Sequence, residues 1–253
     1  MSDSPPARWS ILAPDPDVVA RLSREADVSP LLARLLVVRG VASAQQARAF
    51  LSPSLEQLHS PYLLRGLREA VERVSRAIAN QEQILIYGDY DVDGTTAVVI
   101  LKTAIELCGG SADFHVPHRI KEGYGIKDDV IERAAEAGVK VVISVDTGIR
   151  AFQAAETARR VGIDLIVTDH HLPEVHDGVP KALAVLNPNQ PGCDYPGKDL
   201  CGAGVAFKLA QALFARFKDA PDQSRLTASF LKMVAIATIA DAVPLTGENR
   251  ALA

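Results

Sequence analysis

Carboxylate and imidazole side chains recur in this sequence directly after short apolar runs. Seven of them follow the runs ILIY, VVISV and DLIVT: Asp89, Asp91, Asp93, Asp146, Asp169, His170 and His171. If they share one cleft, the carboxylates repel one another and resist ionisation unless cations neutralise them. Mixed carboxylate and imidazole ligands favour Mn²⁺, with Mg²⁺ as the alternative. Two such ions that share a carboxylate can activate water for phosphoryl displacement, so the pattern predicts metal-dependent phosphoryl chemistry.

The apolar runs are candidate β-strands, and amphipathic helices separate them. The five expected strands are Gln83–Tyr87, Ala112–Val116, Val139–Val145, Asp164–Thr168 and Ala182–Leu186. The expected helices among and after them are about Thr95–Cys108, Lys127–Ala137, Arg150–Val161, Ala203–Phe217 and Arg225–Ala240. Strands that are apolar throughout and alternate with helices indicate a parallel sheet covered on both faces. We therefore expect an α/β fold with a five-stranded, mostly parallel, doubly wound sheet.

The position of the polar residues agrees with this fold. In a doubly wound sheet, ligands bind beyond the carboxyl ends of the strands, near the point where the strand order reverses. The acidic and imidazole residues lie at those ends, Asn187 follows the fifth strand, and Asp241 follows the last helix. The sequence thus directs carboxylates from several elements toward one region.

The first part of the chain has a different pattern. Residues 1–62 form short amphipathic segments, and Ser43 followed by Gln46 resembles a helix capping box. A longer helix is expected over Leu67–Ala79. We expect a helical N-terminal region over residues 1–62, an α/β domain over 63–245 and the beginning of a linker over 246–253.

Composition excludes some classes of protein. Of the 253 residues 48% are hydrophobic, which suits one large or two small globular domains. Neither a membrane-length apolar run nor a secretory signal is present, and the segment up to Pro16 is polar. Cys108, Cys193 and Cys201 form no CxxC pair, so we expect reduced thiols in a cytoplasmic protein. The net charge of −4 decides little about nucleic-acid binding, since an acidic metal site would conceal a basic surface.

Each motif has a simpler interpretation when it is taken alone. The Asp89-x-Asp91-x-Asp93-Gly94 segment could open a calcium loop, but the twelfth position is Ile100 and a strand precedes it. A phosphate-binding Walker loop is excluded because no lysine follows Gly94. Asp146 alone could cap the next helix, and an isolated histidine pair is most often an ordinary loop feature. These interpretations weaken when all the features must be explained together.

Together, the motifs resemble those of the DHH phosphoesterase superfamily. The relevant segments are Asp91-x-Asp93, Ser144–Gly148, Asp169-His170-His171 and Ala240-Asp241. The flanking segments resemble the RecJ exonuclease family within it: Tyr87–Thr96, Pro117–Arg119 with Glu122–Gly125, Leu186–Asn189, Ile239–Leu245, Leu36–Gly40 and Phe50–Pro53. The resemblance covers nearly the whole chain, and the motifs are specific in combination.

The resemblance implies roles for individual residues. Two Mn²⁺ ions, or Mg²⁺ in their place, would be held by Asp91, Asp93, Asp146, His170 and Asp241, with Asp146 bridging them. Asp89, Asp169 and His171 would be catalytic residues beside the metals. Arg119, Lys121, Tyr124 and Asn187 would contact substrate; for Arg119 and Lys121, solvated loop charges are nearly as good an explanation. Family II pyrophosphatases have a histidine ligand at the place of Tyr87, so one metal here would lack a ligand.

The resemblance also implies a function. It is 5′ to 3′ exonucleolytic cleavage of single-stranded DNA in repair and recombination. The enzyme would be a monomer that does not associate with a membrane. A single-strand-binding protein or a helicase would be a partner through other regions. The family's second domain is missing from residues 1–253, so we expect weak activity from this part. The alternatives are a small oligonucleotide or cyclic-dinucleotide phosphodiesterase and a non-catalytic replication scaffold. About 80 residues before the first strand argue against the former, and the intact set of ligands argues against the latter.

Overall fold

The computed structural model describes residues 10–217 and 223–253, and the chain divides into two compact units, Met1–Gln57 and Leu58–Ala253. Residues 1–9 of the expected N-terminal region lie outside the described residues. The first unit contains three helices and a short 3₁₀ helix: α1 (Pro16–Ala26), α2 (Pro30–Val38), α3 (Ala44–Leu51) and η1 (Leu55–Gln57). Leu22 and Leu36 are at the centre of its small core. The capping box of Ser43 and Gln46 is confirmed at the start of α3.

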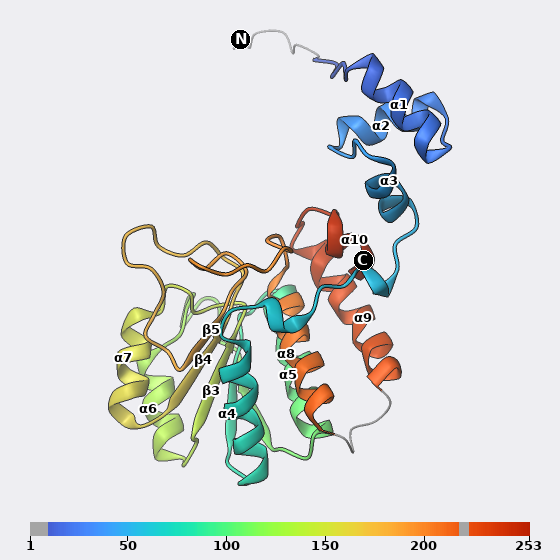
Figure 1. The fold of residues 1–253 in the computed structure, drawn as a ribbon. Coiled ribbons are helices and arrows are strands. Elements are labelled where there is room, and N and C mark those ends of the chain that lie inside the picture. Colours follow the sequence, from blue (N-terminus) through green and yellow to red (C-terminus); the bar gives the residue numbers. More distant parts are fainter. Residues whose placement is uncertain (1–9, 218–222) are drawn as a thin grey trace, which may run out of the picture. The chain divides into compact units, whose positions relative to one another are not determined.

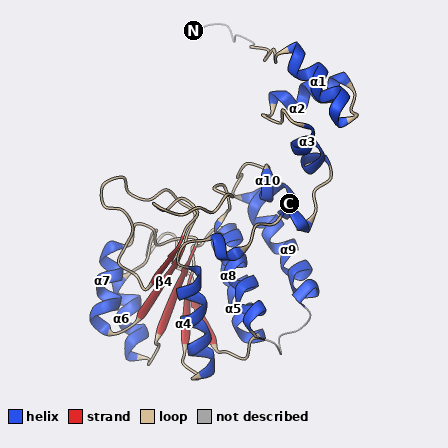
Figure 2. Cartoon of the chain, in the orientation of Figure 1, coloured by secondary structure: helices blue, strands red, loops and turns tan. Residues whose placement is uncertain are grey.

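The second unit is built on a five-stranded sheet in which every pair of neighbouring strands is parallel. The strands are β1 (Ile84–Tyr87), β2 (Ala112–His115), β3 (Val141–Val145), β4 (Asp164–Thr168) and β5 (Ala184–Leu186). Their order across the sheet is β2-β1-β3-β4-β5. The expected α/β fold is therefore confirmed, with strands that begin up to two residues later than the apolar runs (Figure 2).

Helices cover both faces of this sheet. The helices of this unit are α4 (Leu67–Ala79), α5 (Val92–Leu107), α6 (Asp128–Glu136), α7 (Phe152–Val161), α8 (Gly202–Arg216), α9 (Gln223–Ala240) and α10 (Gly247–Leu252), with the 3₁₀ helix η2 (Pro61–Leu63) before α4. Of these, α9 packs on α5 and α8, and α10 packs on α9. Successive residues of a strand point to opposite faces. Ile84 and Ile86 lie in the buried cluster that also contains residues of α4, α5, α8 and α9, whereas Leu85 and Tyr87 lie in the cluster with residues of α6 and α7. Helices thus lie on both faces of the sheet (Figure 1), and β1, β3 and β5 are buried along their whole length, which explains their apolar runs. The edge strand β2 differs, since Asp113 and Phe114 are exposed.

Helix α5 begins earlier than the sequence suggested. We expected it to start at Thr95, but its first residue is Val92 and its N-cap is Asp91. The Asp91 side chain accepts a hydrogen bond from the amide of Gly94 at 2.9 Å, which satisfies one of the free amides of the first turn. Asp93 consequently lies within the first helical turn, and its side chain direction is set by the helix.

Residues 246–253, where we expected a linker to begin, contain α10. Glu248 is 3% exposed and forms an ion pair with the fully buried Lys208 of α8. Lys208 Nζ also donates to the carbonyl of His59 at 3.0 Å, and the Tyr195 hydroxyl donates to Glu248 at 2.5 Å. Removing one partner of such a pair would leave a buried charge, at a cost of about 3–5 kcal/mol. The network therefore holds α8 and α10 together within the second unit.

Two expectations from composition can be compared with the structure. Among the described residues, no helix combines the length and apolar character needed to cross a membrane. Cys108, Cys193 and Cys201 are all buried and free, so none forms a disulfide.

Candidate metal centre

The reversal of strand order in the second unit occurs between β1 and β3. From β1 the chain passes to β2 on one side and then returns to β3 on the other. Because the paired strands are parallel, their carboxyl ends lie at the same edge, and Tyr87 pairs with Ser144 there. The segments that follow β1, β3 and β4 carry most of the predicted ligands. With Asp241, which follows α9, they form three groups of possible metal ligands, and within each group the donor atoms lie within 4.8 Å of one another. The groups are Asp89 with Asp91 and Asp146, Asp93 with His170 and Asp241, and Asp146 with His170 and His171.

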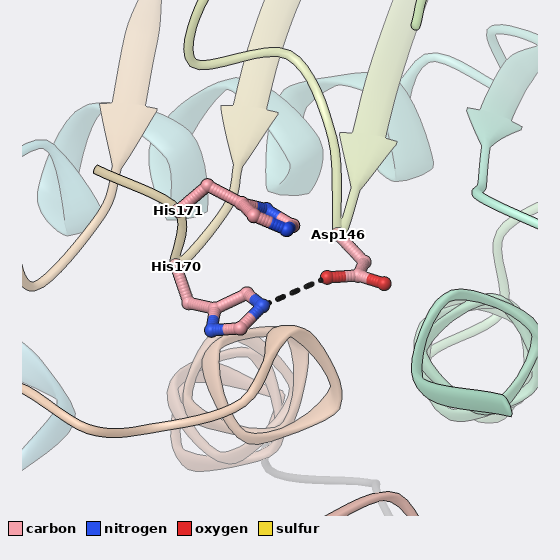
Figure 3. A group of neighbouring side chains, drawn as sticks. All are labelled: Asp146, His170 and His171. Atoms are coloured by element: carbon pink, nitrogen blue, oxygen red, sulfur yellow. Dashed lines mark ion pairs between the residues drawn. The ribbon is translucent and has the colours of Figure 1, made fainter. Parts of the chain in front are cut away.

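His170 contacts three carboxylates from three different elements. Its Nε2 atom lies 3.2 Å from Asp146 Oδ1, 3.7 Å from Asp93 Oδ2 and 3.7 Å from Asp241 Oδ2. Figure 3 shows the rings of His170 and His171 beyond the ends of the strands, with the His170–Asp146 ion pair dashed. The structure thus brings three of the predicted carboxylate ligands to the imidazole of a fourth predicted ligand, His170. The fifth, Asp91, lies in one donor group with Asp146.

Asp146 belongs to two of the three donor groups and has the most unusual environment. It is 1% exposed, and its backbone is in the left-handed region with a φ of 59°. It does not cap α7, whose N-cap is Ala151. Burial, and then the charges of Asp93 and Asp91, raise the pKa of Asp146 to about 10. A left-handed non-glycine residue at a buried carboxylate indicates a functional constraint.

Asp93 is held by backbone amides that sequence reasoning missed. Its Oδ2 accepts from the amide of Gly202 at 2.6 Å, and its Oδ1 accepts from the amide of Ala203 at 2.8 Å. Both amides belong to the first turn of α8, where amides have no partner within the helix and the helix dipole favours a negative charge. The only signal in the sequence is the small-residue run Cys201–Gly204 at the start of a helix.

Asp169 organises the turn that carries both histidines. Its Oδ1 accepts from the amides of His170 and His171 at 2.7 and 3.1 Å and lies 2.7 Å from His171 Nδ1. Its Oδ2 accepts from the amide of Ile149 at 2.8 Å. Burial alone would raise the pKa of Asp169, but these hydrogen bonds outweigh it and lower the pKa. The hydrogen bond to Asp169 in turn raises the pKa of His171.

Asp89 and Tyr87 lie at the edge of the centre. Asp89 is 4% exposed and accepts from the amide of Tyr90 at 2.7 Å, and burial raises the pKa of its carboxyl group. The hydroxyl of Tyr87 donates to the carbonyl of Gly125 at 3.0 Å. Tyr87 is therefore used to fix the loop before α6, and its hydroxyl is directed at that loop.

The four residues predicted to contact substrate have different positions. Tyr124 is 53% exposed, and its ring meets the ring of His171 edge to face at 6.2 Å. The guanidinium of Arg119 lies 5.2 Å from the ring centre of Tyr90, and Lys121 is exposed. Asn187 is fully buried, and its amide nitrogen donates to the carbonyl of His171 at 2.9 Å.

A pocket of about 750 Å³ lies beside His171. Its walls come from the segments after β3 and β4, the first turn of α7 and the segment around Tyr124: they include Tyr124, Ile126, Gly148, Phe152, His171 and Leu172. The lining is mostly apolar, with Asp169 and His171 at the side of the donor groups. Such a pocket next to charged groups suits a ligand with an apolar part and an anionic part.

The donor set fits divalent cations. Asp146 Oδ1 and His170 Nε2 are buried and 3.2 Å apart, yet neither forms a hydrogen bond within the described residues. Buried polar atoms without partners are costly unless another group satisfies them. Carboxylate oxygens with one imidazole are ligands that Mn²⁺ and Mg²⁺ accept, whereas the free cysteines are not part of the cluster.

Comparison with known proteins decides the family. The model of the DHH family, N-terminal domain, matches residues 83–238, which contain all the strands and the DHH triplet 169–171. The chain belongs to the DHH family. It is 43% identical over 246 residues to the single-stranded-DNA-specific exonuclease RecJ of Bacillus subtilis (strain 168), covering 97% of this chain and 30% of that protein.

Solved structures agree with this membership in the DHH family. RecJ of Thermus thermophilus in complex with Mn²⁺ matches 97% of this chain and 34% of its own, with 29% identity and a TM-score of 0.77. The complex of RecJ from the same organism with Mg²⁺ matches 97% of this chain and 30% of its own, with 28% identity and a TM-score of 0.65. This DHH chain therefore spans about a third of the length of these relatives.

Proposed function

We propose that this DHH domain hydrolyses phosphodiester bonds with two divalent cations, as part of a 5′ to 3′ exonuclease that acts on single-stranded DNA. The observation that carries the proposal is the convergence of three donor groups at the point where the strand order reverses, each of which contains the buried Asp146 or its neighbour His170. The sequence identity to RecJ, which is named a single-stranded-DNA-specific exonuclease, supports the choice of substrate. We infer that the protein is a cytoplasmic monomer whose partner is a single-strand-binding protein or a helicase.

The residues divide the work at this centre. Asp91, Asp93, Asp146, His170 and Asp241 would hold the cations. Asp146 would be shared because its carboxylate has two oxygens and lies in one donor group with Asp91 and in another with His170. When bound, two divalent cations activate water and neutralise charge on the phosphate oxygens. Asp93 is preset for this by the amides of α8.

His171 has a separate role in the proposal. The carboxylate of Asp169 lies at hydrogen-bond distance from Nδ1 of His171 and raises the pKa of His171, which favours the charged ring. The Nε2–H group of the charged ring would then be the donor available to a ligand. That donor can bind a phosphate oxygen of the substrate or of the leaving nucleotide. Asn187 would support substrate binding through the His171 main chain, which its amide group holds.

The mouth of the pocket supplies the remaining contacts. Tyr124 stands next to His171 and offers an exposed ring on which a base can stack. Arg119 and Lys121 are exposed in the same loop and would bind phosphates further along the strand. The carboxylate of Asp89, in one donor group with Asp91 and Asp146, would accept a proton or a hydrogen bond from the attacking water.

The test of the proposed function is a cleavage assay with Mn²⁺ on one oligonucleotide labelled at either end. We expect a 5′ label to appear at once as mononucleotide, and a 3′-labelled strand to shorten gradually. A blunt duplex of the same sequence and a reaction with excess chelator are the controls, and both should remain intact. Hydrolysis of dinucleotides alone would support the small-substrate alternative, and an intact single strand at enzyme excess would contradict the proposal.

The raised pKa of Asp146 predicts a dependence on pH. Metal-free protein keeps a proton on Asp146 that the unfolded chain releases above about pH 4. The stability from this group is therefore complete below pH 4, and it is lost as the pH rises toward 10, because the folded state binds more protons. A bound cation displaces the proton, so we expect the affinity for Mn²⁺ to rise about tenfold per pH unit between about pH 6 and 8.

Titration calorimetry with Mn²⁺ measures this effect. In buffers with different heats of ionisation, the apparent enthalpy should differ by the heat of about one released proton or more. An affinity that does not change with pH, together with no proton release, would show that Asp146 is already ionised before the cation binds.

A further inference from the structure

The first turn of α8 touches two carboxylates of the proposed metal centre at once. We infer that Gly202 is a positioning residue of this centre, because its amide holds Asp93 while the absence of a side chain leaves room for Asp146. The inference rests on the proposed function for its consequence, and it concerns a residue that contributes no side chain to the site.

Two backbone amides at the start of α8 hold the carboxylate of Asp93. Each carboxylate oxygen of Asp93 accepts one amide hydrogen, from Gly202 at 2.6 Å and from Ala203 at 2.8 Å. Two bonds from successive amides fix the rotation of the carboxylate. Because a carboxylate oxygen has two lone pairs, each oxygen keeps one for another partner. Asp93 is therefore oriented by α8 and can still bind a cation.

The backbone of Gly202 also lies close to the side chain of Asp146. A Cβ atom at position 202 would lie 2.5 Å from Asp146 Oδ1, 2.6 Å from its Cβ and 2.7 Å from its Cγ. These distances are far below van der Waals contact. Asp146 is 1% exposed and its backbone is in the left-handed region, so its side chain has little freedom to withdraw. Any side chain at position 202 would push Asp146 away or push α8 outward.

Contacts along α8 hold this helix in place. The Sγ atom of Cys201 accepts from the amide of Gly204 at 3.4 Å, which caps the helix. Further along, the buried ion pair of Lys208 with Glu248 ties α8 to α10. A shift of α8 would also carry the amides of its first turn away from Asp93. Either response to a side chain at position 202 changes the spacing of Asp93 and Asp146.

The experiment compares Gly202→Ala with Gly204→Ala. Both variants make the same substitution in the same turn of α8, so the gain in helix propensity is matched. The three atoms nearest to a Cβ atom at position 204 would be Leu200 Cδ2 at 3.1 Å, Leu200 Cβ at 3.6 Å and Cys201 Sγ at 3.7 Å, none of which belongs to the metal centre. By calorimetry, we expect the affinity for Mn²⁺ to fall about 10- to 100-fold in Gly202→Ala. In Gly204→Ala it should stay within about twofold of wild type, since that turn keeps its amides.

A second measurement needs no metal, and it tests the steric claim even if Gly202→Ala is strongly destabilised. Urea unfolding gives the loss of stability caused by Gly202→Ala in wild type and again in Asp146→Gly. We expect most of the loss to disappear in the Asp146→Gly background, because the atoms that clash are gone. An equal loss in both backgrounds would overturn the inference. So would a Gly202→Ala variant that binds Mn²⁺ as tightly as wild type. A wild-type protein that binds no Mn²⁺ would instead contradict the proposed function, and the unfolding cycle would still decide the steric claim.

Discussion

Asp146→Asn is expected to weaken Mn²⁺ binding at both positions of the centre and to reduce hydrolysis of single-stranded DNA about a thousandfold. Bound cations supply several kcal/mol of charge stabilisation, and each step of about 1.4 kcal/mol changes a rate tenfold. Asp146 belongs to the donor group with Asp89 and Asp91 and to the group with His170 and His171. One substitution should therefore affect both cations, which loss of Asp91 alone would not do.

Without metal, the same variant should be more stable than wild type at neutral pH. The raised pKa of Asp146, about 10, keeps its carboxyl protonated in the folded state while the unfolded chain releases the proton, which costs the wild type stability. Asparagine matches the charge and shape of the protonated carboxyl and cannot ionise in the unfolded chain. Calorimetry with Mn²⁺, urea unfolding and the cleavage assay measure the three quantities. Asp129→Asn is the matched control, since that carboxylate is exposed and pairs with Arg133 on the surface of α6. Normal Mn²⁺ affinity in Asp146→Asn would show that Asp146 is not the shared ligand.

The arrangement of the site could be predicted from the sequence because of one geometric fact. Parallel strands end at the same edge of a sheet, so polar residues after apolar runs must gather there. This is why Asp93, Asp146 and His170 could be grouped although they are far apart in the chain. The strands themselves were recognisable because both faces of the sheet are covered, and burial leaves continuous apolar runs such as Ile84–Tyr87.

Contacts made by the backbone could not be predicted in this way. The amides of Gly202 and Ala203 are 109 and 110 residues from Asp93, and an amide has no residue type to recognise. The early start of α5 was missed because Asp91 was considered only as a ligand, whereas its side chain also caps the helix. A residue can have both roles, and periodicity of apolar side chains does not show a first turn that is polar.

The roles of the two histidines also required coordinates. The sequence places them side by side, but only the structure shows that His170 Nε2 faces three carboxylates while His171 is bound to Asp169. Asp169 was predicted as a catalytic residue on the resemblance alone. It accepts hydrogen bonds from three amides and lies 2.7 Å from Nδ1 of His171, so its proposed contribution is through the position and charge of His171.

Asp169→Asn is expected to lower the turnover of single-stranded DNA about 10- to 100-fold, the usual effect of losing a partner that orients a ligand or catalytic group. Asparagine has one acceptor oxygen in place of two. If this oxygen serves the amides of His170 and His171, its NH₂ group must face the amide of Ile149, and a buried donor is left without a partner. That costs about 1–3 kcal/mol of stability.

The pH profile separates this role from simple destabilisation. The hydrogen bond to Asp169 is the main cause of the raised pKa of His171, so in Asp169→Asn that pKa should fall. The charged ring is present below its pKa, and the decline of activity on the alkaline side should therefore begin at a lower pH than in wild type. Asp164→Asn is the control, since it removes a partner of the buried Arg73 at the other end of β4 and leaves the histidines untouched. If both variants lose stability but only Asp169→Asn shifts the pH profile, Asp169 acts through His171. If the pH profile of Asp169→Asn matched those of wild type and Asp164→Asn, Asp169 would have only a structural role in the turn.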